Sequence, residues 1–304
     1  KIIATIGPAT ESEEDLIQLI SQGVDVLRLN MAHADHDWIR MITERSRKVG
    51  KQLDREPAIM MDVKGPEIRT GYLHQELEIK ESDLLDLVFV AQPNPPSIDG
   101  IWQIEVNYDK LPDHINEGDT VLLDNGLIQL KVINSSKEKI RCQVQGDATL
   151  KSRRHVNLPG IETGLPSLTE KDRRDSLVGI ECNHDFFALS FTRDADAVDL
   201  FRSFLKDNGS DAQIIAKLED QKGVANIDEI IQSADALMVA RGDLGIECPF
   251  EELPIIQRKA VGSSLSAGKP VIVATHMLES MIDSPVPTLS LIHISEPTRR
   301  ALIA

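Results

Sequence analysis

The chain is poor in cysteine, in aromatic residues and in positive charge, and each shortage excludes a class of protein. The 304 residues include only three cysteines, which lack metal-ligand spacing: Cys142, Cys182 and Cys248. An odd number of scattered cysteines argues against a disulfide framework and fits a reducing cytosol. Lysine plus arginine number 33 against 49 acidic residues, a formal net charge of −16. This balance argues against nucleic acid or an anionic membrane as the main partner.

Long apolar runs and a leader segment are also missing. No run approaches the ~20 apolar residues of a membrane span, and no signal peptide is visible. We therefore expect a cytoplasmic protein in which any anionic substrate occupies a local basic pocket. The sequence opens at Lys1 inside an apolar segment and without a methionine, so we expect a fragment at this end.

Apolar segments typical of buried strands alternate with helical patterns at both ends of the chain. The predicted strands are Lys1–Ile6, Val24–Asn30, Ala58–Val63, Phe186–Phe191, Ile214–Ala216, Ala236–Ala240 and Pro270–Thr275. The predicted helices are Glu13–Ser21, Asp37–Leu53, Thr169–Ile180, Ala195–Leu205, Val224–Ile231 and Phe250–Leu265. Such a series predicts a parallel sheet covered by helices. The fold class is α/β, a TIM-type (β/α)8 barrel that is incomplete at about seven strands.

Residues 71–155 break this rhythm. Short alternating segments with turn signals replace the helical patterns, and Asp124-Asn125-Gly126 is a strong hairpin signal. We expect an all-β lid domain inserted into the barrel series. The barrel domain would then consist of residues 1–70 and 156–288.

The last residues do not fit this series. Leu289–Arg299, LSLIHISEPTR, resembles the translation of a common sequencing adapter. We therefore expect residues 289–304 to be a non-native tail. A genuine loop and helix is the alternative.

Two later strand segments end in charged residues that are expected to meet. Lys217-Leu218-Glu219 ends the first and Arg241-Gly242-Asp243 follows the second. Side chains alternate faces along a strand, so Lys217 and Glu219 point the same way. In one parallel sheet, Glu219 and Asp243 would lie side by side. Two carboxylates and an ammonium suit a divalent cation and a phosphate, although salt-bridged rim residues would give the same pattern.

Several motifs follow successive predicted strands. They are TIGP (5–8), RLN (28–30), DVKGPEIR (62–69), SF (190–191), KLE (217–219), ARGD (240–243) and AT (274–275), with VNLPG (156–160) and MLESM (277–281). In these motifs the chain closely resembles the pyruvate kinase family, from Lys1 to about Thr288. The resemblance implies a barrel with an inserted lid, and transfer of a phosphoryl group from phosphoenolpyruvate to ADP.

The resemblance also implies roles for the residues at the rim. Glu219 and Asp243 would hold Mg²⁺ or Mn²⁺, and Lys217 would stabilise the transferring phosphoryl group and the enolate. Arg28 would grip the phosphate, with a salt bridge to a neighbouring carboxylate as the alternative. The substrate and nucleotide contacts would come from further residues: the backbone of Gly242 and Asp243, the hydroxyl of Thr275, and, on the nucleotide side, Pro8, Asn30, His33 and Arg154.

A K⁺ site is implied by Asn30, Asp62 and the backbone carbonyl of Val63. The family usually has serine where this chain has Ala32, so one side-chain oxygen is missing. Glu67 matches the form associated with K⁺-dependent members.

Three other departures from the family pattern involve four positions. His276 replaces a glutamine, which would introduce a group that titrates near pH 6.5. Asn125 replaces an aspartate of the lid turn, which weakens any lid contact to a metal–nucleotide complex. Arg153-Arg154 replace lysines and retain the charge.

The resemblance implies a homotetrameric parent with a further C-terminal domain. With the eighth strand missing, we expect the chain to have little or no activity. Two other hypotheses stay open at this point. One is a metal-dependent lyase or aldolase acting on pyruvate enolates, against which the lid and KGPEIR argue. The other is an inactive truncated or decayed fragment.

Overall fold

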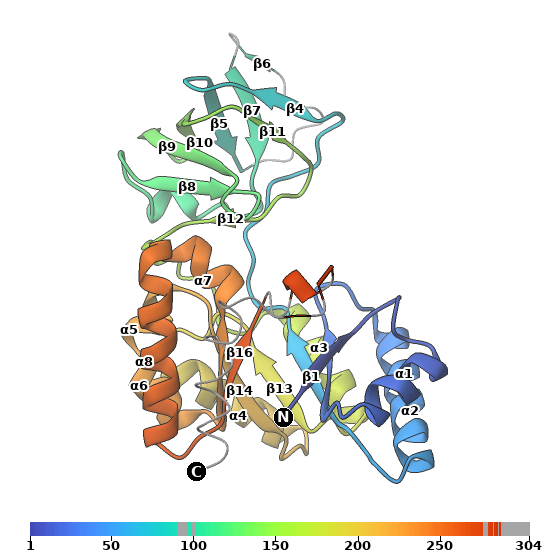
Figure 1. The fold of residues 1–304 in the computed structure, drawn as a ribbon. Helices are drawn as coiled ribbons and strands as arrows, with labels where there is room; N and C mark the ends of the chain where they lie inside the picture. The colour runs from blue at the N-terminus through green and yellow to red at the C-terminus, as the bar shows by residue number, and fades with distance from the viewer. Residues whose placement is uncertain (90–96, 99–100, 276–278, 282, 285, 287–304) are drawn as a thin grey trace.

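The computed structural model describes residues 1–89, 97–98, 101–275, 279–281, 283–284 and 286. The expected tail at 289–304 and the substitution at His276 lie outside these residues. Figure 1 shows two parts, a layer of strands and helices below and a sheet domain above, joined by two chain segments.

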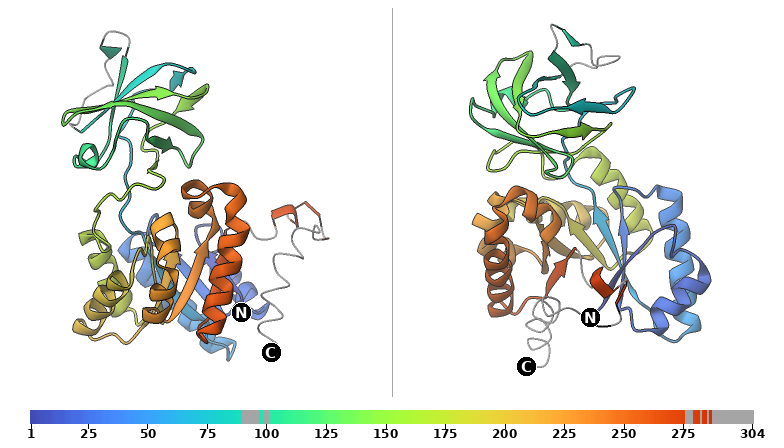
Figure 2. Two further views of the ribbon diagram at one scale, coloured as in Figure 1. Left: turned by 90° about the vertical axis from the view of Figure 1, so that its left-hand side faces the viewer. Right: turned by 45° about the horizontal axis from the view of Figure 1, so that its top comes forward.

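The lower part is built on one seven-stranded parallel sheet in the order β1-β2-β3-β13-β14-β15-β16. Its strands are β1 (Ile3–Ile6), β2 (Val26–Asn30), β3 (Ala58–Val63), β13 (Phe186–Leu189), β14 (Gln213–Leu218), β15 (Ala236–Ala240) and β16 (Val271–Ala274). The sheet curls, with helices along its outer side (Figure 2). The prediction of an incomplete α/β barrel of seven strands is therefore confirmed for the described residues.

The helices follow the strands as the sequence predicted. They are α1 (Glu13–Ser21), α2 (His36–Gln52), α3 (Glu170–Glu181), α4 (Ala195–Asp207), α5 (Gln221–Ala225), α6 (Ile227–Ser233), α7 (Arg241–Glu247) and α8 (Leu253–Ser266), with 3₁₀ turns η2 (Phe250–Glu252) and η3 (Glu279–Met281). A further 3₁₀ turn, η1 (Leu111–Asp113), lies in the upper part. Two expected helices differ in detail. The one over Val224–Ile231 is two short helices that share Asn226 as a cap, and the one starting at Phe250 begins with η2.

Side chains at the helix starts explain where these helices begin. Ser12, Asp35 and Asp194 each accept a hydrogen bond from a backbone N–H in the first turn of their helix. Thr169 and Asp172 form a reciprocal capping box at the start of α3. Each cap satisfies N–H groups that have no partner inside the helix.

The barrel part has two apolar layers, one on each face of the sheet. The larger lies between the sheet and the helices and contains buried Leu16, Ile39, Phe187 and Phe201. The smaller, on the inner face, consists of five buried residues: Met60, Ala188, Ile215, Ala236 and Met238. The inner face of the sheet therefore has few buried apolar side chains, and polar side chains follow them at the rim.

The upper part is all-β, as predicted. One sheet has the order β12-β8-β9-β10-β5-β7-β6, and β11 pairs with β4. The strands are β4 (Leu77–Ile79), β5 (Leu84–Val88), β6 (Ser97–Ile98), β7 (Ile101–Glu105), β8 (Thr120–Leu123), β9 (Ile128–Ser135), β10 (Lys139–Val144), β11 (Ala148–Leu150) and β12 (Val156–Asn157). The predicted hairpin joins β8 to β9, and its turn has positive φ at Asp124 (52°), Asn125 (57°) and Gly126 (84°).

Two antiparallel linkers connect the lid to the barrel. Arg69 and His155 form an isolated bridge. The N–H of Val156 donates to the carbonyl of Ile68 at 2.8 Å, and the N–H of Thr70 donates to the carbonyl of Arg154 at 2.8 Å. The lid sheet continues through β12, so its pairing extends two residues past the expected end at His155.

Two further expectations concern cysteines and membranes. All three cysteines are free thiols. Among the described residues, no helix has the length and apolar character needed to cross a bilayer.

Candidate active site

The candidate site lies at the C-terminal ends of the barrel strands, and Lys217 is at its centre. Alternation along β14 puts Ile214, Ala216 and Leu218 in the layer under the helices, whereas Ile215 belongs to the inner layer. Lys217 therefore points to the inner face with Ile215. Only 9% of this lysine is exposed.

Three groups hold the ammonium of Lys217. Its Nζ lies 3.0 Å from Asp62 Oδ1, 2.9 Å from Glu219 Oε1 and 2.7 Å from Ser190 Oγ. Burial by itself lowers the pKa of Lys217, but the carboxylates of Glu219 and Asp62 outweigh it and hold this pKa above the usual value. The amine is a fixed positive charge, as a phosphate-stabilising group requires.

Glu219 is buried beside the same ammonium. Its Oε2 accepts the N–H of Phe191 at 2.6 Å, and only 2% of the residue is exposed. Burial raises the pKa of Glu219 to about 7, Lys217 opposes this rise, and the charge of Asp243 adds to it. The predicted approach of the two carboxylates is therefore present, with Asp243 in the first turn of α7.

Glu219 and Asp243 fit a divalent cation. Two neighbouring carboxylates at a buried site repel each other, and a hard cation with oxygen ligands would relieve that repulsion. In the part of the chain that the structure describes, no group of three or more His, Cys, Asp or Glu residues could hold a metal. The protein would thus supply two carboxylates and leave the other positions to substrate and water.

Arg28 reaches the cluster from β2. Its Nε donates to Asp62 Oδ2 at 2.7 Å, its Nη1 donates to Thr5 Oγ1 at 2.9 Å, and its Nη2 also pairs with Asp62. The alternative considered from the sequence, a salt bridge to a neighbouring carboxylate, is therefore present. These contacts use three of the five N–H donors of a guanidinium, so two remain for an anion.

The oxygens proposed for K⁺ come from adjacent strands. Asn30 and Asp62 are paired positions on β2 and β3. Asn30 Oδ1 accepts the N–H of Ala32 at 3.0 Å, and the carbonyl of Val63 accepts the hydroxyl of Ser190 at 2.6 Å. Each oxygen has a further lone pair, so the set fits a monovalent cation. Arg28 and Lys217 already neutralise Asp62, which weakens its pull on another cation.

Thr275 lies against the start of α7. A Cβ placed on Gly242 would lie 3.1 Å from Thr275 Cγ2, so the side chain of Thr275 packs closely against this glycine. The side chain of Arg241 donates to the carbonyls of Ala274 and Thr275. Thr275 has φ of 69°, a strained value for a β-branched residue. The structure thus brings Gly242, Asp243 and Thr275 to one corner of the rim.

The predicted nucleotide residues are more dispersed. Pro8 and His33 occupy the loops after β1 and β2, whereas Arg154 lies on a linker and its Nη1 pairs with Asp124 Oδ1 at 3.2 Å. Within the described residues, no hydrogen bond or ion pair joins these three. Their shared role is still a prediction.

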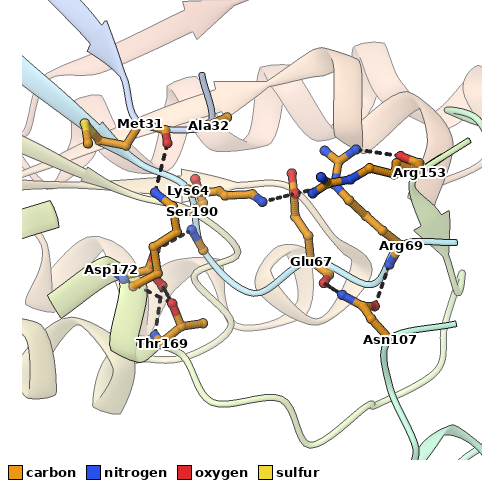
Figure 3. Close-up of polar contacts among 12 residues, drawn as sticks. Met31, Ala32, Lys64, Glu67, Arg69, Asn107, Arg153, Thr169, Asp172 and Ser190 are labelled. Carbon is orange, nitrogen blue, oxygen red and sulfur yellow. Dashed lines mark hydrogen bonds and ion pairs between the residues drawn. The ribbon is translucent and has the colours of Figure 1, made fainter. Parts of the chain in front are cut away.

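Two groups near the site make contacts that the sequence did not indicate. Ser190 bridges Lys217 and the carbonyl of Val63 through its hydroxyl. Glu67, in the linker after β3, lies between Lys64 Nζ at 2.9 Å and Arg69 Nε at 2.8 Å (Figure 3). Burial raises the pKa of Glu67, but Arg69 and Lys64 reverse this and lower it overall. The motifs SF and KGPEIR contained both residues without indicating these contacts.

Comparison with known proteins places the chain in a family. Residues 1–294 match the family model "Pyruvate kinase, barrel domain". The chain is 43% identical over 292 residues to pyruvate kinase of Sporosarcina psychrophila, covering 95% of this chain and 49% of that protein. It is 44% identical over 292 residues to the enzyme of Geobacillus stearothermophilus, with the same coverage.

A solved structure agrees with these relatives. A crystal structure of a pyruvate kinase from Cryptosporidium parvum superposes with a TM-score of 0.90 at 36% identity, covering 100% of this chain and 62% of that one. The chain spans about half the length of the curated relatives it matches. The chain belongs to the pyruvate kinase family.

Proposed function

We propose that the protein to which this chain belongs transfers the phosphoryl group of phosphoenolpyruvate to ADP, giving pyruvate and ATP. One observation carries the proposal: the buried ammonium of Lys217 stands between Asp62 and Glu219 at the end of a barrel strand. Phosphoryl transfer depends mostly on positioning and on neutralising charge, and this cluster supplies both.

Lys217 is the central catalytic residue in this proposal. Its ammonium would lie against the phosphoryl group during transfer and against the enolate oxygen that remains. Because Asp62, Glu219 and Ser190 fix Nζ from three directions, little reorganisation is needed when the charge moves. Arg28 would bind the phosphate through its two remaining N–H donors.

Glu219 and Asp243 would hold Mg²⁺ or Mn²⁺. Such a cation, when bound, neutralises charge on the substrate and phosphate oxygens. The N–H groups of Gly242 and Asp243 would bind the substrate carboxylate. The hydroxyl of Thr275, at the same corner, would deliver the proton that converts the enolate to pyruvate.

K⁺ would bind Asn30, Asp62 and the Val63 carbonyl. Support comes from the paired positions of Asn30 and Asp62 and from the spare lone pairs described above. The nucleotide would occupy the space between lid and barrel, contacting Pro8, Asn30, His33 and Arg154. The full-length protein would be a cytoplasmic homotetramer. The net charge of −16 of the 304-residue chain is compatible with an anionic substrate, because Arg28 and Lys217 lie together at the rim.

The test has an activity arm and a binding arm, both on the full 304-residue chain. A coupled assay measures pyruvate formed from phosphoenolpyruvate and ADP, with Lys217→Met compared with Lys206→Met, an exposed lysine on α4. Any activity should fall at least ~100-fold in Lys217→Met and stay unchanged in the control. Turnover would overturn our expectation that this chain has little activity.

The binding arm decides the question if turnover is absent. Electron paramagnetic resonance measures Mn²⁺ binding in the presence of phosphoenolpyruvate, and Glu219→Gln should abolish it. Failure of the unaltered chain to bind Mn²⁺ and phosphoenolpyruvate would refute the proposed site. Pyruvate released from an aldol or oxaloacetate substrate without ADP would instead favour the lyase hypothesis.

A further inference from the structure

Glu247, the last residue of α7, is a buried acid with no part in the mechanism above. Only 8% of it is exposed. Its Oε1 accepts a hydrogen bond from Asn157 Nδ2 at 2.8 Å, and Asn157 is itself 2% exposed. A buried bond to a carboxylate is strong and directional, so it fixes the separation of the two segments that carry it.

These two segments belong to different parts of the molecule. Asn157 lies on β12, which pairs with β8 in the lid sheet. Glu247 ends a helix that lies on the barrel rim below the lid (Figure 1). A second contact lies beside the first, because a Cβ placed on Gly126 in the lid hairpin would be 3.5 Å from Ile246 Cγ2. The end of α7 therefore contacts the lid at two points.

Glu247 is also connected to both carboxylates of the proposed metal site. Asp243 is four residues earlier on α7, which is one helical turn. The backbone carbonyl of Glu247 accepts a hydrogen bond from Gln221 Nε2 at 2.6 Å, and Gln221 follows Glu219 by two residues. One residue thus joins the lid strand, the helix that carries Asp243 and the turn that follows Glu219.

We infer that Glu247 is a positioning residue that couples the position of the lid to the placement of the two rim carboxylates. When the lid moves, Asn157 moves with β12 and displaces Glu247, and α7 transmits the displacement to Asp243. The consequence of this coupling rests on the proposed function. Nucleotide bound under the lid and the metal–substrate complex at the rim would change each other's affinity.

A cavity of about 500 Å³ beside this contact gives the side chains room to rearrange. Asn157, Gln221 and Glu247 all line it. Arg193 and Asp220, which form an ion pair at 2.7 Å, lie on its barrel side. A densely packed junction would resist displacement, whereas side chains that line a cavity can move without clashing.

The first experiment needs no ligand. Amide hydrogen exchange is measured on the full chain for Asn157→Ala and for Asn134→Ala, an exposed lid residue that serves as the control. Amides of α7 should exchange at least ~10-fold faster in Asn157→Ala than in the unaltered chain, and at the unaltered rate in Asn134→Ala. The exchange rates of α2 should not change in either variant. Unchanged exchange in α7 of Asn157→Ala would overturn the coupling.

The second experiment measures the coupling between ligands. The affinity for Mn²⁺ with phosphoenolpyruvate is determined with and without saturating ADP. The ratio of the two affinities should fall about fivefold or more in Glu247→Ala. In Glu247→Gln it should equal the ratio of the unaltered chain, because the amide oxygen still accepts a hydrogen bond from Asn157. Glu251→Ala, at an exposed acid nearby, is the matched control.

The two experiments separate the possible failures. A residue with a merely structural role would weaken both ligands in Glu247→Ala and leave their ratio unchanged, which would overturn the inference. If the unaltered chain binds neither ligand, the proposed function fails, and the exchange experiment still decides whether lid and α7 are coupled.

Discussion

At the scale of single residues, the site depends on one shared carboxylate. Asp62 receives Arg28 from one strand and Lys217 from another, and it is 2% exposed. Two cations that would repel each other are thereby held at one rim. Asp62 therefore offsets part of the positive charge that Arg28 and Lys217 bring to this rim.

We predict that Asp62→Ala destabilises the chain by about 3 kcal/mol, because it leaves two buried or partly buried cations without their common partner. Urea unfolding at pH 7 measures the change. Asp37→Ala is the control, since the side chain of Asp37 is fully exposed and its loss should cost under about 0.5 kcal/mol. Equal stabilities for the two variants would show that Asp62 is not what holds Arg28 and Lys217.

A second prediction concerns Ala32. Ala32→Ser restores a hydroxyl beside Asn30 and should strengthen K⁺ binding several-fold, because an oxygen ligand is added to a site of oxygen ligands. The measurement is the rise in Tm in KCl over tetramethylammonium chloride at equal ionic strength. Ala34→Ser, in the same loop, should respond like the unaltered chain. An identical K⁺ response in all three would remove these residues from the K⁺ site.

The sequence predicted some of these residue contacts and could not predict others. The proximity of Lys217 and Glu219 followed from strand alternation, which is local and independent of the fold. The bonds from Ser190 to Lys217 and from Arg28 to Asp62 depend on which strands become neighbours. Segments far apart in the chain carry no local pattern that specifies such a pairing.

At the scale of elements, α3 packs on the sheet through a glycine. A Cβ on Gly179 would lie 2.8 Å from Phe187 Cε1 and 3.0 Å from Met61 Cε, whereas one on Gly262 in α8 has nothing within 4 Å. We predict that Gly179→Ala destabilises by about 1–3 kcal/mol through overpacking. Gly262→Ala should stabilise by about 1 kcal/mol through helix propensity. Thermal unfolding measures both, and stabilisation by both would disprove the close packing.

The contact between α2 and the loop after α3 should depend on pH. His184 is buried against Thr43, with His184 Nε2 2.9 Å from Thr43 Oγ1. Burial, aided by Arg47, lowers the pKa of His184 to about 4. The folded state therefore keeps this histidine neutral while the unfolded state protonates near pH 6.5. The contribution of this residue to the free energy of unfolding is fully present above pH 6.5 and falls by about 3 kcal/mol as the pH drops to 4.

Urea unfolding of the chain and of His184→Gln between pH 7 and pH 4 tests this. The two stability curves should converge as the pH falls, because only the unaltered chain is destabilised by keeping a buried imidazole neutral. His74→Gln, in the lid, is the control for general acid effects. Parallel curves for the chain and His184→Gln would contradict the lowered pKa.

Element boundaries were predicted from caps and periodicity with limited error. Helix α1 and strands β3 and β15 have the predicted ends, because a cap or a charged residue marks each. The break between α5 and α6 was missed. The apolar positions Val224, Ile227, Ile230 and Ile231 fit one helix, and the interruption at Asn226 arises where its Nδ2 bonds the carbonyl of Arg193 at 2.8 Å, a tertiary contact.

At the scale of the whole molecule, the parallel sheet covered by helices followed from the alternation of strands and helices, and the inserted lid followed from the break in that alternation. The position of the lid did not, since it depends on contacts such as Asn157 with Glu247 that involve neither periodicity nor caps. Composition gives the total charge of the chain but does not locate it. A net charge of −16 coexists with a rim that contains Lys217 and Arg28.

The antiparallel bridge between Arg69 and His155 allows a test of the whole architecture. Replacing residues 70–154 with Asn-Gly closes this bridge as a two-residue hairpin. We predict that the shortened chain keeps the parallel sheet, seen by circular dichroism and a cooperative thermal transition, and loses ADP binding. A chain without cooperative unfolding would show that the barrel requires its lid.

The same bridge bears on how the lid could have been inserted into a barrel during evolution. A domain whose entry and exit strands are adjacent can be gained or lost in a single recombination event, because the host keeps one loop with unchanged ends. The hydrogen bond from the N–H of Val156 to the carbonyl of Ile68 lies on the barrel side of the bridge, so it can persist whichever module is inserted into the third barrel loop.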